Sequence, residues 1–223
     1  MTTPITGREF GETPGTEDWR VIGDGACAYF AVDSLTAAIR FVQAIGAIPG
    51  IDAYPPDIDI RPDGVTVRLI TNADGYFGMS QHHVEQARQV SAAARQLGLA
   101  ATPAAVQSIL VVPGAGAASD VMPFWQAALG YNRRSDSPDE DLVDPRSRGP
   151  AFWFEAMEEP RADRGGGDIH IAAWVPYEVA ETRVAAARAA GGRLVRDQFA
   201  PAWWTLADSA GNEIDIATIK YRD

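Results

Sequence analysis

The chain has 223 residues, 46% of them hydrophobic, which allows one large domain or two of about 100 residues each. Its formal net charge of -11 at pH 7 argues against a nucleic-acid partner, because phosphate binding requires clustered positive charge. No stretch approaches the roughly 20 apolar residues that span a bilayer. The N-terminus has no signal-peptide pattern, and the single cysteine, Cys27, cannot form an internal disulfide. We therefore expect a cytoplasmic protein without a membrane partner.

The first hundred residues predict an α+β unit with the order β-β-α-β-β-α. A hairpin is expected at 19–30, around a glycine turn, and an alternating strand at 65–69. A helix begins at Ser34, and Ser80 caps a second helix at 81–97. The helices are expected to cover one face of an antiparallel sheet. The buried face predicted for the first helix consists of Leu35, Ile39, Val42 and Ile45.

The second half of the chain repeats one pattern of elements. Residues 106–219 predict two β-α-β-β-β units in tandem, joined at a glycine-rich segment. Corresponding features lie about one unit apart: Glu155 and Asp215 are 60 residues apart, and Gly130 and Gly191 are 61 apart. We therefore divide the chain into residues 1–99, a linker at 100–104 and a second domain at 105–223.

Four polar side chains occupy corresponding places in the two units. His170 lies on an alternating strand at 168–175, opposite a row of aliphatic side chains. Glu155 and Asp215 lie on the later strands of the two units, and Gln107 opens the first. A pseudo-twofold arrangement would bring all four together on the face away from the helices. One imidazole, two carboxylates and one amide oxygen suit a divalent ion such as Zn²⁺, Ni²⁺, Co²⁺, Fe²⁺ or Mn²⁺. Glu155 and Asp215 are then the catalytic candidates, as ligands or bases.

Four motifs in residues 105–223 carry a family resemblance: Val112-Pro113, 124–131, Ile169-His170-Ile171 and the Asp-x-x-Gly-Asn turn within 206–213. They resemble the vicinal oxygen chelate superfamily, which includes glyoxalase I, bleomycin-resistance proteins and extradiol dioxygenases. The resemblance implies a tandem βαβββ, glyoxalase-like domain. It also places Gln107, Glu155, His170 and Asp215 on the four metal positions of the family, although Asp215 is one methylene shorter than the usual glutamate.

An alternative without metal stays open, because many members of that superfamily bind none and use these positions to line a cavity. Trp153, Trp174 and Trp203 would then make the cavity aromatic, suited to a planar or apolar ligand. Packing in the core is the competing interpretation of these tryptophans. The function is therefore either a metal-assisted lyase or isomerase of a small organic substrate, or a non-catalytic drug- or metabolite-binding protein. The expected partner is a small molecule, and a homodimer stays open.

Residues 5–98 carry a second resemblance through Trp19, 28–30, 52–55, 65–71 and 78–80. These segments are similar to pterin-4a-carbinolamine dehydratase. Family members carry His-His-Pro where this chain has Ala53-Tyr54-Pro55, and Thr-His where it has Thr71-Asn72. Because the family histidines act as acid and base, we predict a dehydratase-like antiparallel sheet without dehydratase activity. Activity as a 4a-hydroxytetrahydrobiopterin dehydratase is the third functional alternative.

His82 and His83 stand at the start of the second predicted helix, and His83 replaces an aspartate of the dehydratase family. Adjacent residues on a helix point about 100° apart. We therefore expect these two histidines to be solvent-facing or capping residues and not joint ligands of one ion.

Overall fold

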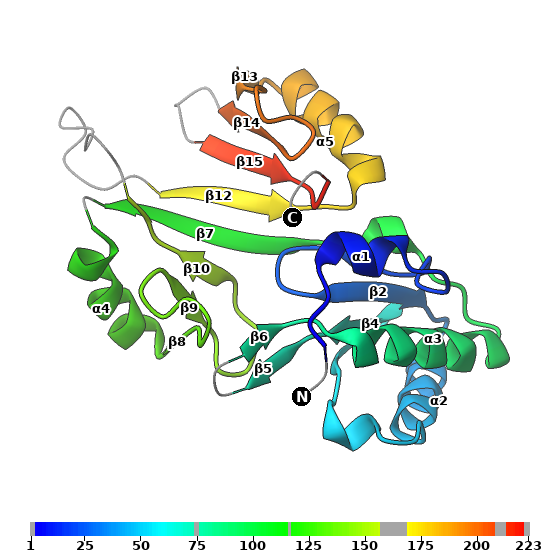
Figure 1. Cartoon of the computed structure of the whole chain (residues 1–223). Helices are drawn as coiled ribbons and strands as arrows, with labels where there is room; N and C mark the ends of the chain where they lie inside the picture. The colour runs from blue at the N-terminus through cyan, green and yellow to red at the C-terminus, as the bar shows by residue number, and fades with distance from the viewer. Residues whose placement is uncertain (1–2, 74–75, 116, 157–168, 208–212, 221–223) are drawn as a thin grey trace.

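The computed structural model describes residues 3–73, 76–115, 117–156, 169–207 and 213–220 (Figure 1). Two sheets dominate it. An N-terminal antiparallel sheet has the strand order β1-β2-β4-β3, and a nine-stranded C-terminal sheet crosses the other half of the molecule. In Figure 1 the long strands β7 and β12 lie side by side at the centre of the larger sheet. No helix among the described residues is long and apolar enough to cross a membrane.

The N-terminal part contains the predicted elements in the predicted order, with an additional short helix before them and an additional pair of short strands, β5 and β6, before the last helix. Their bounds are α1 Gly7–Glu12, β1 Arg20–Val21, β2 Ala26–Ala31, α2 Leu35–Gly46, β3 Asp57–Arg61, β4 Gly64–Leu69, β5 Thr71–Ala73, β6 Tyr76–Gly78 and α3 Gln81–Gln96. Alternation along β2 and β4 sends Phe30, Val65 and Val67 into the core shared with the helices. Cys27 and Arg68 face the opposite, helix-free side of the sheet.

Helix α2 buries a different face from the one predicted. Leu35 is 60% exposed and Ile39 is 45% exposed, whereas Ala38, Phe41 and Ile45 are buried. The prediction was therefore wrong for Leu35 and Ile39, whereas Val42 packs against the core and Ile45 is buried. Two apolar rows on this helix both recur with helical spacing, and the position of the sheet decides which one is covered.

The C-terminal sheet is built from two copies of one βαβββ unit. The first contains β7 Ser108–Ala115, α4 Ala118–Leu129, β8 Asn132–Arg133, β9 Asp141–Val143, β10 Ala151–Trp153 and β11 Glu155–Ala156. The second contains β12 Ile169–Trp174, α5 Tyr177–Ala189, β13 Arg193–Arg196, β14 Trp203–Ala207 and β15 Glu213–Ala217. The strand order is β13-β14-β15-β12-β7-β10-β9-β8. From each edge to the centre, the strands of a unit follow in the same order, and the first strands of the two units, β7 and β12, pair antiparallel at the centre. The predicted tandem repeat is confirmed in this topology.

Both helices of the repeat cover the same face of this sheet. Ile109 of β7 packs in the core under α5, and Val111 packs in the core under α4. Because side chains alternate along a strand, Ser108, Leu110 and Val112 face the helix-free side. This alternation fixes the side on which each predicted site residue lies.

Local boundaries in the repeat differ from the prediction in three places. Strand β7 continues through Pro113, which pairs with Ile169, because β11 pairs with Gly114 and Ala115 beyond it. The strand predicted at 151–157 is divided into β10 and β11, with Phe154 between them in the core under α4. Helix α4 begins at Ala118, after a cap residue, Ala117, whose side chain makes no capping bond, instead of at a Ser119 or Asp120 cap.

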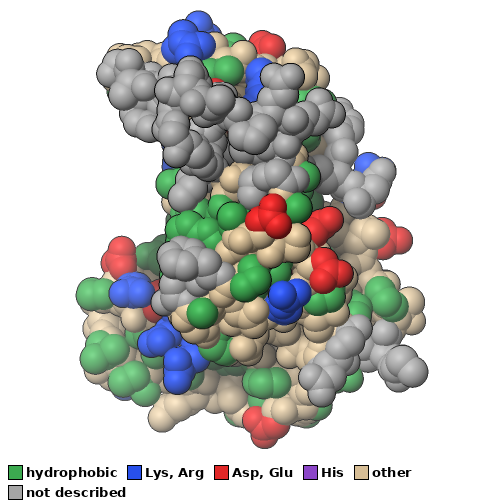
Figure 2. All heavy atoms as spheres, turned by 90° about the vertical axis from the view of Figure 1, so that its left-hand side faces the viewer, with side chains coloured by type: hydrophobic (Ala, Val, Ile, Leu, Met, Phe, Trp, Pro, Cys, Tyr) green, Lys and Arg blue, Asp and Glu red, His purple; other side chains and the backbone are tan. Residues whose placement is uncertain are grey.

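The N-terminal part packs directly against the C-terminal sheet. The predicted linker is bonded to β2, where the backbone N–H of Thr102 donates to the carbonyl of Tyr29 at 2.8 Å. Ile22, Cys27 and Val106 form a small buried cluster, against which Tyr29 and Trp174 pack. On the face shown in Figure 2, acidic and hydrophobic side chains lie side by side across the middle of the molecule, with basic side chains in smaller groups.

Candidate functional site

A cleft of about 1160 Å³ lies between the two sheets. One wall is the helix-free side of the N-terminal sheet, including Cys27, Thr66 and Arg68. The other wall is the C-terminal sheet, mostly its first unit, including Leu110 and Ala151, with Trp174 from the second unit. The loop from Asp144 to Pro150 also lines it. The cleft is large enough for a drug-sized organic ligand.

Two of the three predicted cavity tryptophans line this cleft. Trp174 pairs with Ser108 across the β12–β7 ladder, and Trp153 follows Phe152, which pairs with Val111. These positions are four residues apart along β7, so the two backbones are separated by about 13 Å along the strand direction. Trp203 is not among the residues that line the cleft and stacks on Phe199, with ring centroids 4.2 Å apart.

Gln107 lines the cleft beside Ser108, and it precedes β7 by one residue. Its Oε1 accepts a hydrogen bond from Nη1 of Arg183 in α5 at 2.9 Å. The place of Gln107 in the predicted set of four ligands stays a prediction.

Glu155 and Asp215 lie on strands whose register directs their side chains to the helix-free face. Glu155 pairs with Gly114, and Asp215 pairs with Ala172. Oδ1 of Asp215 accepts a hydrogen bond from the Thr205 hydroxyl at 2.6 Å. The backbone of His170 pairs with Val112, but the side chain of His170 lies outside the described part of the chain. Among the described residues, no three His, Cys, Asp or Glu side chains are grouped closely enough to hold a metal. The metal site stays a prediction.

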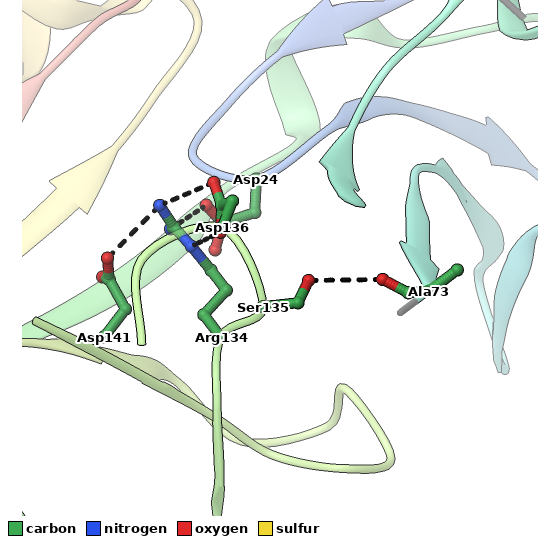
Figure 3. Close-up of polar contacts among 6 residues, drawn as sticks. All are labelled: Asp24, Ala73, Arg134, Ser135, Asp136 and Asp141. Atoms are coloured by element: carbon green, nitrogen blue, oxygen red, sulfur yellow. Dashed lines mark hydrogen bonds and ion pairs between the residues drawn. The ribbon is translucent and has the colours of Figure 1, made fainter. Parts of the chain in front are cut away.

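Arg134 joins the two sides of the cleft at one end (Figure 3). Its guanidinium lies 3.4 Å from Asp24 of the N-terminal part, 2.7 Å from Asp136 and 3.2 Å from Asp141. It also lies over the ring of Phe77, 4.8 Å from the centroid. The next residue, Ser135, donates a hydrogen bond to the carbonyl of Ala73 at 3.3 Å. The loop that carries Arg134 and Ser135 therefore contacts the N-terminal part through an ion pair, a cation–π contact and a hydrogen bond to the backbone.

The acidic groups around Arg134 are partly or fully removed from water. Burial raises the pKa of Asp24 and of Asp141, and the charge of Arg134 opposes this rise in both. Burial also raises the pKa of the Cys27 thiol to about 12. Cys27 is therefore protonated at neutral pH and behaves as an apolar part of the cleft wall.

The positions compared with the dehydratase histidines lie in two places. Asn72 is exposed on β5 and lines the cleft. Tyr54 stacks on His82, with ring centroids 3.7 Å apart, at the start of α3. Ala53 ends a short 3-10 helix that runs from Ile51. The absence of dehydratase activity stays a prediction, as does the likeness of this part to the dehydratase family.

His83 acts at the start of α3 as a capping residue. Its Nδ1 accepts the backbone N–H of Ser80 at 2.9 Å, which agrees with the predicted capping alternative, but the residue is only 1% exposed. Burial, together with the neighbouring His82, lowers the pKa of His83 to about 4. Burial also lowers the pKa of His82. Two buried atoms, His82 Nε2 and Gln86 Oε1, have no hydrogen-bond partner within the described residues.

The contribution of the N-terminal sheet to the cleft was missed by the sequence analysis. Cys27, Thr66 and Arg68 alternate with core residues on β2 and β4, so their exposure on one face could be predicted. No local pattern indicates that a second sheet covers that face. Arg134 was likewise missed, because the sequence shows only a charged loop around it.

Comparison with known proteins identifies the repeat. Residues 110–217 match the family model described as a glyoxalase-like domain. This part of the chain is a glyoxalase-like domain. The match agrees with the predicted resemblance to the vicinal oxygen chelate superfamily, and it includes β15 and most of β7 but none of the N-terminal part.

Two solved structures align with about half of the chain and 99% of their own length. One is described as an NAD-dependent benzaldehyde dehydrogenase from Legionella pneumophila, with 15% identity and a TM-score of 0.37 over 50% of this chain. The other is a glyoxalase/bleomycin resistance protein/dioxygenase superfamily member from Vibrio splendidus 12B01, with 16% identity and a TM-score of 0.32 over 51% of this chain. Likenesses of this size carry no information about activity. No curated protein matches the sequence.

Proposed function

We propose that the glyoxalase-like domain and the N-terminal part together bind a small organic ligand with a planar aromatic portion in the cleft between them. The observation that carries this proposal is the placement of Trp153 and Trp174. Both line one cleft of about 1160 Å³, and Trp153 remains 37% exposed. Large aromatic side chains left accessible in a concave site are typical of recognition of flat ligands.

The composition of the walls supports an aromatic ligand. Apolar groups such as Leu110, Ala151 and Ile70 line the cleft beside the tryptophans, and the protonated Cys27 thiol adds to them. Polar groups from both sheets, such as Thr66 and Ser108, are available to orient the ligand. The apolar groups supply contact area for a ring, and the polar groups supply hydrogen bonds that fix its orientation.

The test measures binding of 2-naphthamide and 2-naphthol by calorimetry and by quenching of tryptophan fluorescence. Trp153→Ala and Trp174→Ala are each expected to weaken binding by about threefold to tenfold, which corresponds to the loss of one aromatic contact. Trp203→Ala is the matched control, because Trp203 does not line the cleft. Absence of binding to the unaltered protein, or an equal loss in all three variants, would overturn the proposal.

A metal-assisted lyase or isomerase is the second candidate. It is favoured by one observation: the register of β11 and β15 directs Glu155 and Asp215 to the same helix-free face. A divalent metal bound there would supply a Lewis acid, and Glu155 or Asp215 would act as ligand or base. Stoichiometric metal in protein purified without added metal, lost in His170→Ala, is the expected result. Metal retained in His170→Ala would contradict this candidate, and metal lost in Gln107→Ala as well would include Gln107 in the set.

A further inference from the structure

We infer that the cleft selects aromatic ligands that carry a carboxylate, and that Arg146 and Arg148 bind this group. The inference rests on the proposed function, because it specifies which ligand the same cleft takes. Both arginines line the cleft and lie on the loop between β9 and β10.

The distribution of charge within the cleft points to these two residues. Six carboxylates (Asp24, Asp57, Asp59, Glu140, Asp141 and Asp144) and five guanidinium groups line it, so it has no general excess of positive charge. Arg68 lies 2.6 Å from Asp57, Arg61 lies 2.8 Å from Asp59, and Arg134 is held by three carboxylates. The side chains of Arg146 and Arg148 form no hydrogen bond and no close ion pair within the described residues. Arg146 and Arg148 are therefore the cationic groups of the lining that are available to bind an anionic ligand.

The carboxylate nearest to them in sequence is already engaged. Asp144 accepts backbone N–H groups from Arg146 at 2.9 Å, from Arg148 at 3.1 Å and from Gly149 at 2.9 Å. These bonds, with a smaller contribution from the charge of Arg148, lower the pKa of Asp144. Asp144 therefore directs its oxygens to the backbone of the loop and leaves both guanidinium groups available.

The same bonds hold the loop in a defined shape. Ser147, between the two arginines, has a φ of 53°, in the left-handed region that residues other than glycine seldom adopt. The loop is also fixed at Gly149, where the Tyr131 hydroxyl occupies the space that a Cβ would need. A loop that is already ordered loses less conformational entropy when a ligand binds.

A carboxylate fits this arrangement better than a doubly charged phosphate. Guanidinium groups form paired hydrogen bonds with either anion. Glu140 lines the same cleft, however, and its charge adds to that of the acids held by arginines. The repulsion from these carboxylates rises with the charge of the ligand, so a monoanion is preferred.

The test compares three ligands that share one ring system: 2-naphthoate, its neutral analogue 2-naphthamide, and 2-naphthyl phosphate. The unaltered full chain is expected to bind 2-naphthoate about tenfold more tightly than the amide. This factor corresponds to the lower range of free energy for a hydrogen bond to a charged group, which applies because both arginines are exposed. The phosphate is expected to bind more weakly than 2-naphthoate. The preference for 2-naphthoate over the amide should decrease as the salt concentration rises.

In the Arg146→Ala/Arg148→Ala double variant the preference for 2-naphthoate should disappear, while binding of the amide stays unchanged. Arg146→Lys/Arg148→Lys should retain part of the preference, since it keeps both charges. Arg193→Ala, an exposed arginine of β13 that does not line the cleft, is the control and should keep all of it.

Each other outcome has a separate meaning. Equal binding of 2-naphthoate and the amide, with both weakened by Trp153→Ala, would overturn the carboxylate inference and leave the cleft as the ligand site. Tighter binding of the phosphate would overturn the choice of a monoanion. Absence of binding by all three compounds would overturn the proposed function itself and, with it, the inference.

Discussion

Replacing Arg134 by alanine is expected to lower the free energy of unfolding by about 2–3 kcal/mol. The main reason is Asp141, which is only 6% exposed and would remain in the interior without its cation. Removal of one partner from a buried ion pair typically destabilises a protein by about 3–5 kcal/mol. The smaller figure applies here because Asp24 and Asp136 are 27% and 38% exposed and can be solvated again.

The neighbouring arginine is a matched control. Arg133 forms its ion pair with Asp139, which is 94% exposed, at 3.6 Å. Exposed pairs of this kind contribute about 0–1 kcal/mol, so Arg133→Ala should cost less than about 1 kcal/mol. Both variants are measured by urea unfolding followed by far-UV circular dichroism, with free energies extrapolated to water.

A second substitution separates the loss of a buried charge partner from the loss of packing. Asp141→Asn in the Arg134→Ala background removes the unpaired carboxylate and should recover about 1 kcal/mol. The reasoning is refuted if Arg134→Ala costs no more than Arg133→Ala. It is also refuted if Asp141→Asn lowers the stability of the Arg134→Ala variant further, since the buried charge would then not be the cause.

Three further experiments test other parts of the structure. The pKa of His83 is lowered to about 4 in the folded state, so the unfolded chain binds more protons below about pH 6.5 and stability falls as the pH decreases. His83→Gln keeps a capping side chain without titrating and should abolish about 2 kcal/mol of the stability loss between pH 7 and 5, measured by urea unfolding. Cys27, with a pKa raised to about 12, should react with a thiol reagent at pH 8 at least about a hundredfold more slowly in the folded than in the urea-unfolded chain. Phe41→Ala should destabilise by about 3–5 kcal/mol because its ring is buried, and Leu35→Ala by less than about 1 kcal/mol, in the same unfolding assay.

Each of these expectations has a contrary outcome. Identical pH profiles for the unaltered protein and His83→Gln would show that His83 does not titrate abnormally in the folded state. Rates of Cys27 modification within tenfold of each other would place the thiol in contact with solvent. A larger loss from Leu35→Ala than from Phe41→Ala would reinstate the face of α2 that the sequence analysis favoured.

The sequence predicts the elements and the repeat well, because both depend on local patterns. Alternation at 213–217 correctly placed Ile214 and Ile216 under α5 and Asp215 on the other side. It does not fix the side of Gln107, which lies just before β7, where the strand period gives no phase. A one-residue error there reverses the side of the side chain.

The arrangement of the two sheets could not be predicted from such patterns. Arg134 and Asp24 are 110 residues apart, and nothing in either segment indicates the contact. Phe41 and Leu35 show the same limit on a smaller scale, since both lie on apolar rows of one helix and only the position of the sheet separates them. The tryptophans could be proposed as cavity residues, but the difference between Trp174 and Trp203 depends on where the N-terminal sheet packs.

One wall of the cleft lies outside the part of the chain that matches the glyoxalase-like family model. Strands β3 and β4 precede residues 110–217, yet Thr66, Arg68 and Asp59 on these strands line the cleft in which we propose that a ligand binds. Substitutions on that surface would change which molecules are accepted while leaving every residue of the glyoxalase-like fold in place. Selection for binding of a new compound would then act on the N-terminal part, outside the residues that match the family model. Proteins with near-identical repeats would then differ in the ligands they bind.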